Sequence, residues 1–489
     1  MNLTGWVSRL LLALCLTGPG FSQTGELVLV AHQRELRGAW VASVANLNWP
    51  SQAALPMEAQ QKELLMILDR LQEARLNAIF FQVRPEGDAL YRSELEPWSR
   101  FLSGAQGADP GFDPLEFLIE AAHRRNIEVH AWLNPYRAQA VPPATAHQVA
   151  PHLAIEHPDQ VHTYGQLLWM DPSAPVVRQR LLSVCRDLSQ RYDIDGLHFD
   201  DYFYPYPDGE LEFPDQSNWD AYKAGEGPLS RGDWRREQVN LAIQEVSQAI
   251  QEEKEYVRFG ISPFGIPAPE KPAQISGLDQ YEKLYADTQL WMDRGWVDYL
   301  APQLYWPTTR QAQAFPILLR WWTDHARQGR YIFAGINLAA LGSKPEWSLD
   351  EYRQQFAMLQ NHREGGARGF ILWSIAPLLE GRLNVGRDLL ARQIAQVVLT
   401  PPLARASDHE VSPPDLELKG TRLWLWHQDD TPLRAWTLYR ADGPQWKLAQ
   451  IVPGEQESIE IQPGRWAVAA VCKDGRESLG QVIEILQPP

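Results

Sequence analysis

The feature of this chain that most limits its fold is an alternation of short apolar runs with helical patterns, repeated eight times. The runs that we interpret as strands are Leu36 to Ser43, Ala78 to Arg84, Glu128 to Asn134, Gly196 to Asp201, Arg258 to Pro263, Tyr299 to Tyr305, Tyr331 to Asn337 and Gly369 to Ser374. Strands that alternate with helices form parallel βαβ units. Eight such units predict an α/β fold, the closed (β/α)8 barrel.

Helical patterns fill the segments between the predicted strands. From Gln60 to Leu76, apolar side chains recur at helical spacing. Asp113-Pro114 and Asp171-Pro172 each place a capping carboxylate before a proline, which predicts that a helix begins at each pair. Three of the segments that follow strands are long, and they would all emerge at the same face of the barrel, where function is usually found. These segments are 85–112, 135–170 and 202–232.

The N-terminus has the pattern of an export signal. An apolar run, 10–16, follows Arg9, and small residues near Ser22 would form a cleavage site. The run is too short to span a bilayer. We therefore expect residues 1–22 to be a signal peptide and the mature protein to have no integral membrane span. The expected location is the periplasm or the cell surface, with a lipoprotein anchored at Cys15 as the alternative.

The composition changes after residue 399. Residues 400–415 are rich in proline and predict a linker, which follows a barrel domain of residues 33–399. Residues 416–489 contain short alternating runs separated by turn residues, the pattern of a small all-β sandwich of the fibronectin III or immunoglobulin type. Its tryptophans are expected mainly in the core, with glycan binding as the alternative. They are Trp424, Trp426, Trp436, Trp446 and Trp466.

Charge and cysteine content narrow the possible functions. The formal net charge of −16 argues against nucleic acid and against anionic membrane surfaces as partners. Cys185 and Cys472 fall in different predicted domains and are expected to be buried free thiols. We expect no cofactor and no metal, because the chain has no His-Glu-x-x-His motif. A loose cluster of His130, His198 and Asp200 leaves a zinc site open as an alternative.

Residues 195–205 carry the strongest functional pattern, a short strand that ends in two carboxylates among aromatic rings. Because side chains alternate along a strand, one face is apolar and the other consists of His198, Asp200 and Tyr202. A polar face that ends in an acid fits the mouth of a barrel, where catalytic residues follow the strands. We predict Asp200 as nucleophile or electrostatic stabiliser and Asp201 as the proton donor or the group that orients it. The alternative is a pair that caps the next helix or binds a structural ion.

Several long motifs, in order along the predicted barrel, resemble one family. They are Arg37-Gly38-Ala39-Trp40-Val41, Phe81-Gln82-Val83-Arg84-Pro85, Glu96-Pro97-Trp98-Ser99, Asp113-Pro114-Leu115, His130 to Arg137 and Asp195 to Pro205. The chain resembles the bacterial glycosyl-hydrolase-like family 10, which includes glycosidases that cut peptidoglycan strands stripped of their peptides. The resemblance implies a (β/α)8 glycoside hydrolase that acts on envelope glycan.

A weaker likeness connects the same strand to chitinase-type barrels. Their fourth strand reads Asp-Gly-x-Asp-x-Asp-x-Glu, and in this register Asp200 matches the middle acid. Tyr202 stands where the proton-donating Glu is expected, which argues against the substrate-assisted mechanism of those enzymes. The runs 303–306 and 372–374 also resemble chitinase sugar-binding residues.

The remaining site residues are expected where strands end and in the loops that follow them. Polar side chains there would bind sugar hydroxyls or a carboxylate such as a lactyl group, and aromatic rings would stack on pyranose faces. The candidates for substrate binding are Arg84, Glu86, His130, Asn134, Arg137, His198, Tyr202, Tyr305, Trp306 and Trp373. Glu86, Asp88 and Glu94 are also alternative catalytic partners for Asp200. For several of these residues a purely structural role is the alternative.

We therefore expect an exported glycoside hydrolase that cleaves β-linked amino-sugar glycan of the bacterial cell wall, with this polysaccharide as its partner. Two other hypotheses stay open. One is a barrel that binds glycan without cutting it. The other is an α-glucan-type hydrolase that uses the fourth-strand aspartate as nucleophile.

Overall fold

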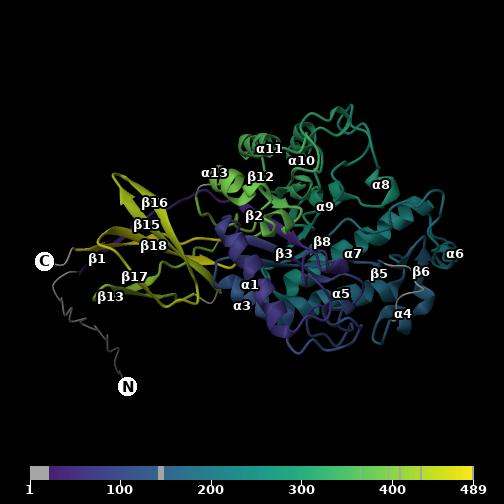
Figure 1. Cartoon of the computed structure of the whole chain (residues 1–489), viewed down its shortest axis with the longest axis horizontal. Coiled ribbons are helices and arrows are strands. Elements are labelled where there is room, and N and C mark those ends of the chain that lie inside the picture. Colours follow the sequence, from purple (N-terminus) through teal and green to yellow (C-terminus); the bar gives the residue numbers. More distant parts are fainter. Residues whose placement is uncertain are drawn as a thin grey trace, which may run out of the picture. The chain divides into compact units, whose positions relative to one another are not determined.

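A computed structural model describes residues 21–140, 148–363, 365–394, 396–406, 409–429 and 432–486. Across these residues the chain forms two compact units (Figure 1). The larger unit comprises residues 33–409 together with 473–476. The smaller unit comprises the described residues before 33 and the rest of the chain after 409.

The described part of the larger unit contains a closed barrel of eight parallel strands. In chain order they are β2 (Leu36–Val41), β3 (Ala78–Arg84), β4 (Glu128–Leu133), β8 (Gly196–Phe199), β9 (Arg258–Ile261), β10 (Tyr299–Leu300), β11 (Tyr331–Ile336) and β12 (Ala367–Leu372). Each strand pairs with its neighbours in the chain, and β12 closes the barrel against β2. The predicted (β/α)8 fold is confirmed, with a strand in each of the eight predicted runs.

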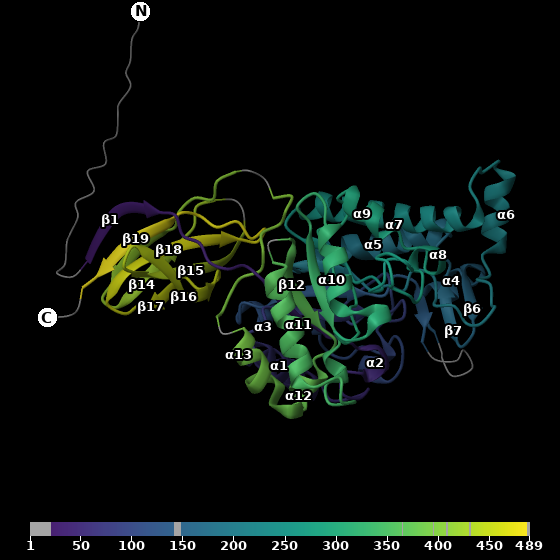
Figure 2. The same cartoon turned by 90° about the horizontal axis from the view of Figure 1, so that it is seen from above.

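Helices surround the strands and bury one large apolar core against them (Figures 1 and 2). The helices of this layer are α1 (Met57–Glu73), α3 (Pro114–His123), α5 (Pro175–Arg191), α7 (Arg231–Glu253), α9 (Thr288–Asp293), α10 (Phe315–Asp324), α11 (Leu349–Asn361), α12 (Ala376–Leu379) and α13 (Ala391–Gln393). The predicted apolar stripe of α1 is present, because Leu64, Ile67, Leu68 and Leu71 are all buried. Apolar periodicity thus sets which face of each helix meets the barrel.

Only one of the two predicted helix starts is correct. The Asp113 carboxylate accepts hydrogen bonds from the backbone N–H groups of Leu115 and Glu116 and caps α3, as predicted. The prediction at Asp171 is wrong, since α5 begins at Pro175. Asp171 instead accepts hydrogen bonds from Ser173 in a local turn, and this satisfies the carboxylate without a helix.

Short elements gather where the loops that follow the strands emerge. They are α2 (Arg100–Ser103), α4 (Leu153–Glu156), α6 (Gln216–Ala224), α8 (Gln280–Lys283) and a three-stranded antiparallel sheet of β5 (Arg137–Gln139), β7 (Leu167–Met170) and β6 (Val161–Tyr164). Figure 2 shows α4, α6, α8, β6 and β7 toward the same end of the unit. The small sheet lies within the long segment 135–170, for which the sequence predicts no strand.

The barrel interior is filled with side chains and is not a channel. Aromatic and aliphatic residues from six of its strands meet there: Leu36, Trp40, Phe80, Trp132, Tyr299, Phe333 and Ile371. Glycines on neighbouring strands make room for the larger rings. A Cβ added at Gly196 would lie 2.4 Å from the His130 ring, and one at Gly260 would lie 2.0 Å from the Tyr299 ring.

The smaller unit is a sandwich of two antiparallel sheets, which confirms the predicted β-sandwich fold. One sheet has the order β1-β19-β18-β15-β16 and the other β13-β14-β17. Their bounds are β1 (Phe21–Val28), β13 (Asp415–Lys419), β14 (Arg422–Trp426), β15 (Leu433–Asp442), β16 (Gln445–Pro453), β17 (Ser458–Glu460), β18 (Gly464–Cys472) and β19 (Gly480–Ile485). Both sheets contribute to one core, in which Trp436 and Trp466 are buried.

Strand β1 comes from the far end of the chain. It pairs antiparallel with β19 and so adds an edge to the five-stranded sheet. The strand begins at Phe21, within the predicted signal peptide of residues 1–22. Cleavage of that peptide and export stay predictions. Cys185 and Cys472 are buried free thiols, as predicted. Among the described residues, no helix combines the length and apolar character needed to cross a membrane.

Candidate active site

The acidic pair lies where the fourth barrel strand ends. β8 ends at Phe199, and Asp200 and Asp201 follow it directly. Leu197 and Phe199 pack into the core between strands and helices, whereas His198 forms its hydrogen bonds inside the barrel. Side chains alternate along a strand, so the side chain of Asp200 points inward like that of His198. Asp200 lies two residues further along the chain and is therefore closer to the mouth of the barrel.

Three N–H donors converge on the Asp200 carboxylate. Trp132 Nε1 donates to Oδ2 over 3.1 Å, and Asn134 Nδ2 donates to the same oxygen over 3.1 Å. The backbone N–H of Tyr202 donates to Oδ1 over 3.3 Å. Trp132 lies beside His198 in the register of β4 and β8, so the pairing of these strands delivers the indole N–H to the acid. Asp200 is only 4% exposed, and every donor therefore acts in a largely water-free setting.

Asp201 is held by a separate set of donors. The Tyr206 hydroxyl, from the loop after β8, donates to Asp201 Oδ2. Gln303, which follows β10, also hydrogen-bonds this carboxylate, and its Nε2 donates to the carbonyl of Ser262 over 3.0 Å. Asp201 is 2% exposed. The two adjacent acids are thus fixed by different parts of the barrel rim.

Burial raises the pKa of both acids toward neutrality. It raises the pKa of Asp200 to about 7, against the lowering effect of Arg137 and with a further increase from the charge of Asp201. It raises the pKa of Asp201 to about 6, against hydrogen bonds from Tyr206 and Gln303 that lower it. Interacting acids titrate as a pair. Near neutral pH this pair holds about one proton, and a glycosidase needs one protonated and one ionised carboxyl.

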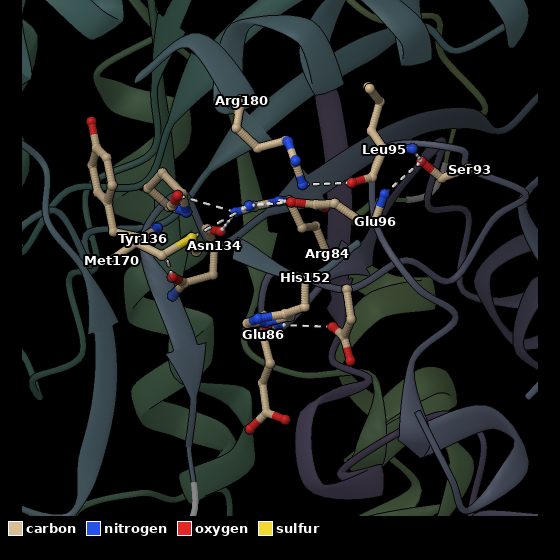
Figure 3. A network of polar contacts seen from close by, with 12 residues as sticks. Arg84, Glu86, Ser93, Leu95, Glu96, Asn134, Tyr136, His152, Met170 and Arg180 are labelled. Atoms are coloured by element: carbon tan, nitrogen blue, oxygen red, sulfur yellow. Dashed lines mark hydrogen bonds and ion pairs between the residues drawn. The ribbon is translucent and has the colours of Figure 1, made fainter. Parts of the chain in front are cut away.

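A buried ion pair supports Asn134 from behind. Arg84 Nη2 contacts Glu96 Oε1 at 2.5 Å, and Arg84 Nη1 donates to the carbonyls of Asn134 and Pro135 over 2.8 and 3.0 Å. Figure 3 shows Arg84 between Glu96 and Asn134. Asn134 Oδ1 accepts the backbone N–H of Arg137 over 2.8 Å, which orients its Nδ2 toward Asp200. Arg84 therefore positions the turn that carries Asn134 and donates to protein groups.

Glu86 is committed to the neighbouring loops. Its carboxylate contacts Arg100 at 3.0 Å and accepts the backbone N–H of Ala140 over 2.5 Å. Its carbonyl lies 2.8 Å from His152 Nε2 (Figure 3). Asp88 accepts the Glu86 backbone N–H over 3.0 Å, and burial raises the pKa of Asp88 to about 7. These contacts join the loops after β3 and β4 at the rim.

The two predicted histidines lie deeper in the barrel than the acids. His198 Nε2 accepts from Trp40 Nε1 over 3.1 Å, and its Nδ1 lies 3.1 Å from the Tyr299 hydroxyl. The same hydroxyl lies 3.2 Å from His130 Nδ1, and His130 Nε2 lies 3.2 Å from Glu128. Burial lowers the pKa of His198 well below its usual value, so this ring is neutral. The structure places both rings in the filled interior and does not bring them to the mouth.

Aromatic rings line the mouth around the acids. Tyr202 packs against Tyr206 with ring centroids 5.5 Å apart. Trp306 meets Phe264 edge-on at 5.7 Å, and Trp373 meets Trp132 edge-on at 6.1 Å. The rings of Tyr202, Tyr305, Trp306 and Trp373 are all partly exposed, which leaves them open to a ligand. Flat, half-exposed rings beside carboxylates suit sugar rings, whose C–H faces stack on them.

Arg137 places a guanidinium in the same mouth. The guanidinium carbon Cζ of Arg137 lies 5.3 Å from the Tyr202 ring centroid, and Arg137 Nε donates to the carbonyl of Pro85 over 3.0 Å. Among the described residues, its two terminal nitrogens have no hydrogen-bond partner. Its charge lowers the pKa of Asp200, so it lies within electrostatic reach of the acids. An arginine whose terminal nitrogens are not engaged by the described residues suits an anionic substrate group.

The structure thus divides the predicted site residues into three groups. Asp200, Asp201, Asn134, Arg137, Tyr202 and Tyr305 gather at the mouth, with Trp306 and Trp373 at its rim. His130 and His198 lie below it, and Arg84 and Glu86 lie behind it. Sequence reasoning missed Trp132 and Tyr206 as partners of the acids, and it placed Gln303 only in a run that resembles chitinase sugar-binding residues. For Trp132 a signal was available, because it lies two residues before Asn134 on the same strand and its side chain therefore points the same way.

No group of three or more metal-binding side chains forms within the described ranges of the chain. His130 and His198 share the Tyr299 hydroxyl as a partner, and Asp200 faces Trp132 and Asn134. The loose zinc cluster considered from the sequence therefore does not assemble in these residues.

Comparison with known proteins identifies the family. Residues 35–348 match the family described as Glycosyl hydrolase-like 10. The chain is 38% identical to "Glycosyl hydrolase YngK" of Bacillus subtilis (strain 168) over 381 residues, which are 76% of this chain and 74% of that protein. It is 34% identical to "Glycosyl hydrolase DigH" of Escherichia coli (strain K12) over 339 residues, 64% of this chain and 76% of that protein. A solved structure, the catalytic domain of β-amylase from Paenibacillus polymyxa, has a TM-score of 0.49 at 11% identity and covers 74% of this chain and 100% of that chain.

The barrel, its acidic pair and the sequence matches together define a glycoside hydrolase built on a (β/α)8 barrel. Within that class, the chain belongs to the glycosyl hydrolase-like 10 family, as the resemblance of its motifs implied. A polysaccharide substrate follows from this membership.

Proposed function

We propose that this glycoside hydrolase cleaves β-linked amino-sugar glycan of the bacterial cell wall, and peptidoglycan strands in particular. One observation carries the proposal: the buried pair Asp200 and Asp201 shares its mouth with the guanidinium of Arg137, whose terminal nitrogens have no partner among the described residues. The pair supplies hydrolysis. The guanidinium favours a glycan that carries carboxylates, as muramic acid does through its lactyl group.

The two acids take different roles. Burial raises the pKa of Asp200 to about 7 and that of Asp201 to about 6, and hydrogen-bond donors hold both carboxylates, so the roles are assigned from position. Asp200 points inward from the strand end, and N–H donors from Trp132, Asn134 and the backbone of Tyr202 fix its carboxyl toward the mouth. Asp200 therefore acts as nucleophile or as stabiliser of the oxocarbenium-like centre. Asp201 is assigned to deliver a proton to the leaving oxygen, with Tyr206 and Gln303 holding its carboxyl in place.

Leaving-group dependence separates these roles. Without Asp201, an aryl glycoside with an activated leaving group needs no proton and is still cleaved, whereas wall glycan is not. Without Asp200, both substrates lose their turnover. We therefore expect Asp201→Asn to retain activity on the aryl substrate and Asp200→Asn to lose it. The reverse pattern would exchange the two roles.

A substrate panel tests the cell-wall assignment. The purified full chain is incubated with peptide-free wall glycan, intact peptidoglycan, chitin and amylose, and soluble saccharides are measured. We expect the highest kcat/KM on peptide-free wall glycan and none above background on amylose. Preferred cleavage of amylose would overturn the proposal in favour of an α-glucan hydrolase. Binding of wall glycan without turnover would favour a non-catalytic barrel.

Arg137 provides the specificity arm of the same test. Arg137→Gln is expected to lower kcat/KM on wall glycan at least tenfold more than on chitin oligosaccharides, which lack carboxylates. An equal loss of kcat/KM on both substrates would show that Arg137 does not recognise the anionic group. Export by the N-terminal signal is a further proposal, checked by the N-terminal sequence of protein recovered from the cell envelope.

A further inference from the structure

The smaller unit presents two tryptophans on the outer face of its three-stranded sheet. Trp424 and Trp426 lie two residues apart on β14, so both side chains leave the strand on the same side. Leu423 and Leu425 point the other way and are buried in the sandwich core. Trp426 is 41% exposed, and Trp424 is half-buried. We call Trp424, Trp426 and their neighbours on this side, Asp415, Glu417, Lys419, Arg422, Ser458 and Glu460, the indole face.

The sandwich does not need these two indoles for its core. Trp436 and Trp466 already fill the space between the sheets, together with leucine, isoleucine and valine side chains. Large aromatic side chains left adjacent on a surface are unfavourable in water unless a partner covers them. From the sequence, the tryptophans of this segment could serve the core or bind glycan. Their burial now distinguishes the core residues Trp436 and Trp466 from the surface residues Trp424 and Trp426.

Polar groups frame both rings. Across the sheet, Glu417 lies opposite Trp424 on one side and Ser458 on the other, and Asp415 lies opposite Trp426. Hydroxyl and carboxylate groups at this spacing can hydrogen-bond the edge of a ligand whose flat side rests on an indole. A purely apolar partner would remove water from these polar groups without replacing its hydrogen bonds and is disfavoured.

The charges of the indole face are mostly neutralised within it. Lys419 Nζ lies 2.9 Å from Glu417, and Arg422 Nε lies 3.2 Å from Glu460. No lysine or arginine of the face is left without a carboxylate partner. Nucleic acid and anionic lipid both need unpaired cations for affinity, so neither suits this surface. A polymer rich in hydroxyls and low in charge does.

The Trp424 ring is presented through its flat side. Lys419 Nζ lies 5.5 Å from the ring centroid, over the indole. The lysine is exposed, so its chain can move aside at little cost. A pyranose ring would occupy the same position with its C–H groups against the indole.

We propose that the indole face is a second glycan-binding site, which holds polysaccharide chains for the barrel in the same polypeptide. Two residues along a strand span about 6.8 Å, so one glycan chain can contact both indoles. Tethering raises the local concentration of substrate at the barrel without contributing to the chemistry. The site rests on the assignment of the barrel as a glycoside hydrolase and is independent of which bond the barrel cuts.

Binding to insoluble glycan tests the proposal. Full-length protein carrying Asp200→Asn, which stops turnover, is sedimented with insoluble peptide-free wall glycan and with chitin. Trp424→Ala/Trp426→Ala is expected to raise the dissociation constant at least tenfold on one of these glycans. Trp446→Ala, a half-buried tryptophan on the other sheet, is the matched control and is expected to change it less than twofold. Trp306→Ala in the same background measures how much of the binding belongs to the barrel mouth.

Turnover in the Asp200-containing protein distinguishes this site from the catalytic one. The double tryptophan variant is expected to keep its kcat/KM on short soluble oligosaccharides and to lose activity at least threefold on insoluble glycan. Trp424→Phe/Trp426→Phe, which keeps flat rings, should restore most of the binding and controls for misfolding. Unchanged sedimentation of the double alanine variant on both glycans would overturn the proposal. So would binding of this face to phosphatidylglycerol vesicles in place of glycan.

Discussion

At the scale of single residues, the site depends on how deep a side chain lies as much as on which way it points. Alternation along β8 places His198 and Asp200 on the same inward face. The two-residue step between them decides that one ring is enclosed and the other group reaches the mouth. The alternation of side chains along the strand could predict that both residues face the barrel interior. It could not predict the depth, because that depends on how far the neighbouring strands and loops extend.

The raised pKa of Asp200 gives a stability prediction. Because burial raises its pKa to about 7, the folded state binds more protons than the unfolded state between about pH 4 and 7. The contribution of Asp200 is therefore favourable at low pH and is lost as the pH rises through 7. Asp200→Asn removes this dependence. At pH 8 the variant should be more stable than the wild type by about 2–4 kcal/mol, and near pH 4 the two should coincide. Calorimetric unfolding across this range checks both points, and parallel curves would contradict the assignment.

Tyr206 gives a prediction about activity. Its hydroxyl lowers the pKa of Asp201, so Tyr206→Phe should raise that pKa. The limb of the kcat/KM profile that reports Asp201 should then move to higher pH, by on the order of one unit. Tyr164→Phe, whose hydroxyl donates to the carbonyl of Leu211 in the same loops, is the control. Coincident profiles for the wild type and Tyr206→Phe would show that this hydrogen bond does not tune the acid.

At the scale of elements, the barrel strands and the first helices follow from sequence, and the inserted pieces do not. The stripe in α1 and the cap at Asp113 are local signals, and both are present in the structure. The sheet of β5, β6 and β7 has strands of three or four residues. Pairings this short are fixed by contacts made after the barrel closes, so local propensity carries little information about them.

The Arg84–Glu96 pair gives a prediction at this scale, because it joins the end of β3 to the loop that follows it, and Arg84 also hydrogen-bonds the turn after β4. Both side chains are about 1% exposed. Glu96→Ala would leave a guanidinium buried without its partner, which costs about 3–5 kcal/mol of unfolding free energy. Chemical denaturation measures the loss. The exposed pair of Arg70 and Glu73 is the matched control, and Glu73→Ala should cost below about 1 kcal/mol. A small loss of unfolding free energy for both variants would show that the buried pair does not stabilise this part of the barrel.

At the scale of the whole molecule, the barrel was predictable because its unit is repeated. The pairing of β1 was not predictable, because its partner lies far away along the chain. Eight similar units leave few alternatives to a closed parallel sheet. Strand β1 pairs with β19 across more than four hundred intervening residues. The partner of an edge strand is set by the assembled sheet, so no local pattern near residue 21 indicates it. The sequence could likewise predict that the strand ends meet at one mouth. It could not predict which side chains contact one another there.

The pairing of β1 has a measurable consequence. Removal of residues 1–28 would leave β19 as an edge strand, bonded only to β18. Amides of residues 480–485 should then exchange with solvent at least tenfold faster, while those of β8 in the barrel should not change. Hydrogen–deuterium exchange with peptide mapping makes the comparison in one experiment. Equal protection of 480–485 in both proteins would show that β1 does not hold this edge.

The central claim is that the acid at the end of the fourth strand performs hydrolysis, and one comparison tests it most directly. The turnover number on peptide-free wall glycan is measured for the wild type, for Asp200→Asn and for Asp208→Asn, an exposed acid in the following loop. The account predicts a loss of about 10²–10⁴-fold for Asp200→Asn with its fold intact, and less than twofold for Asp208→Asn. An Asp200→Asn enzyme that releases sugar at the wild-type rate would contradict it.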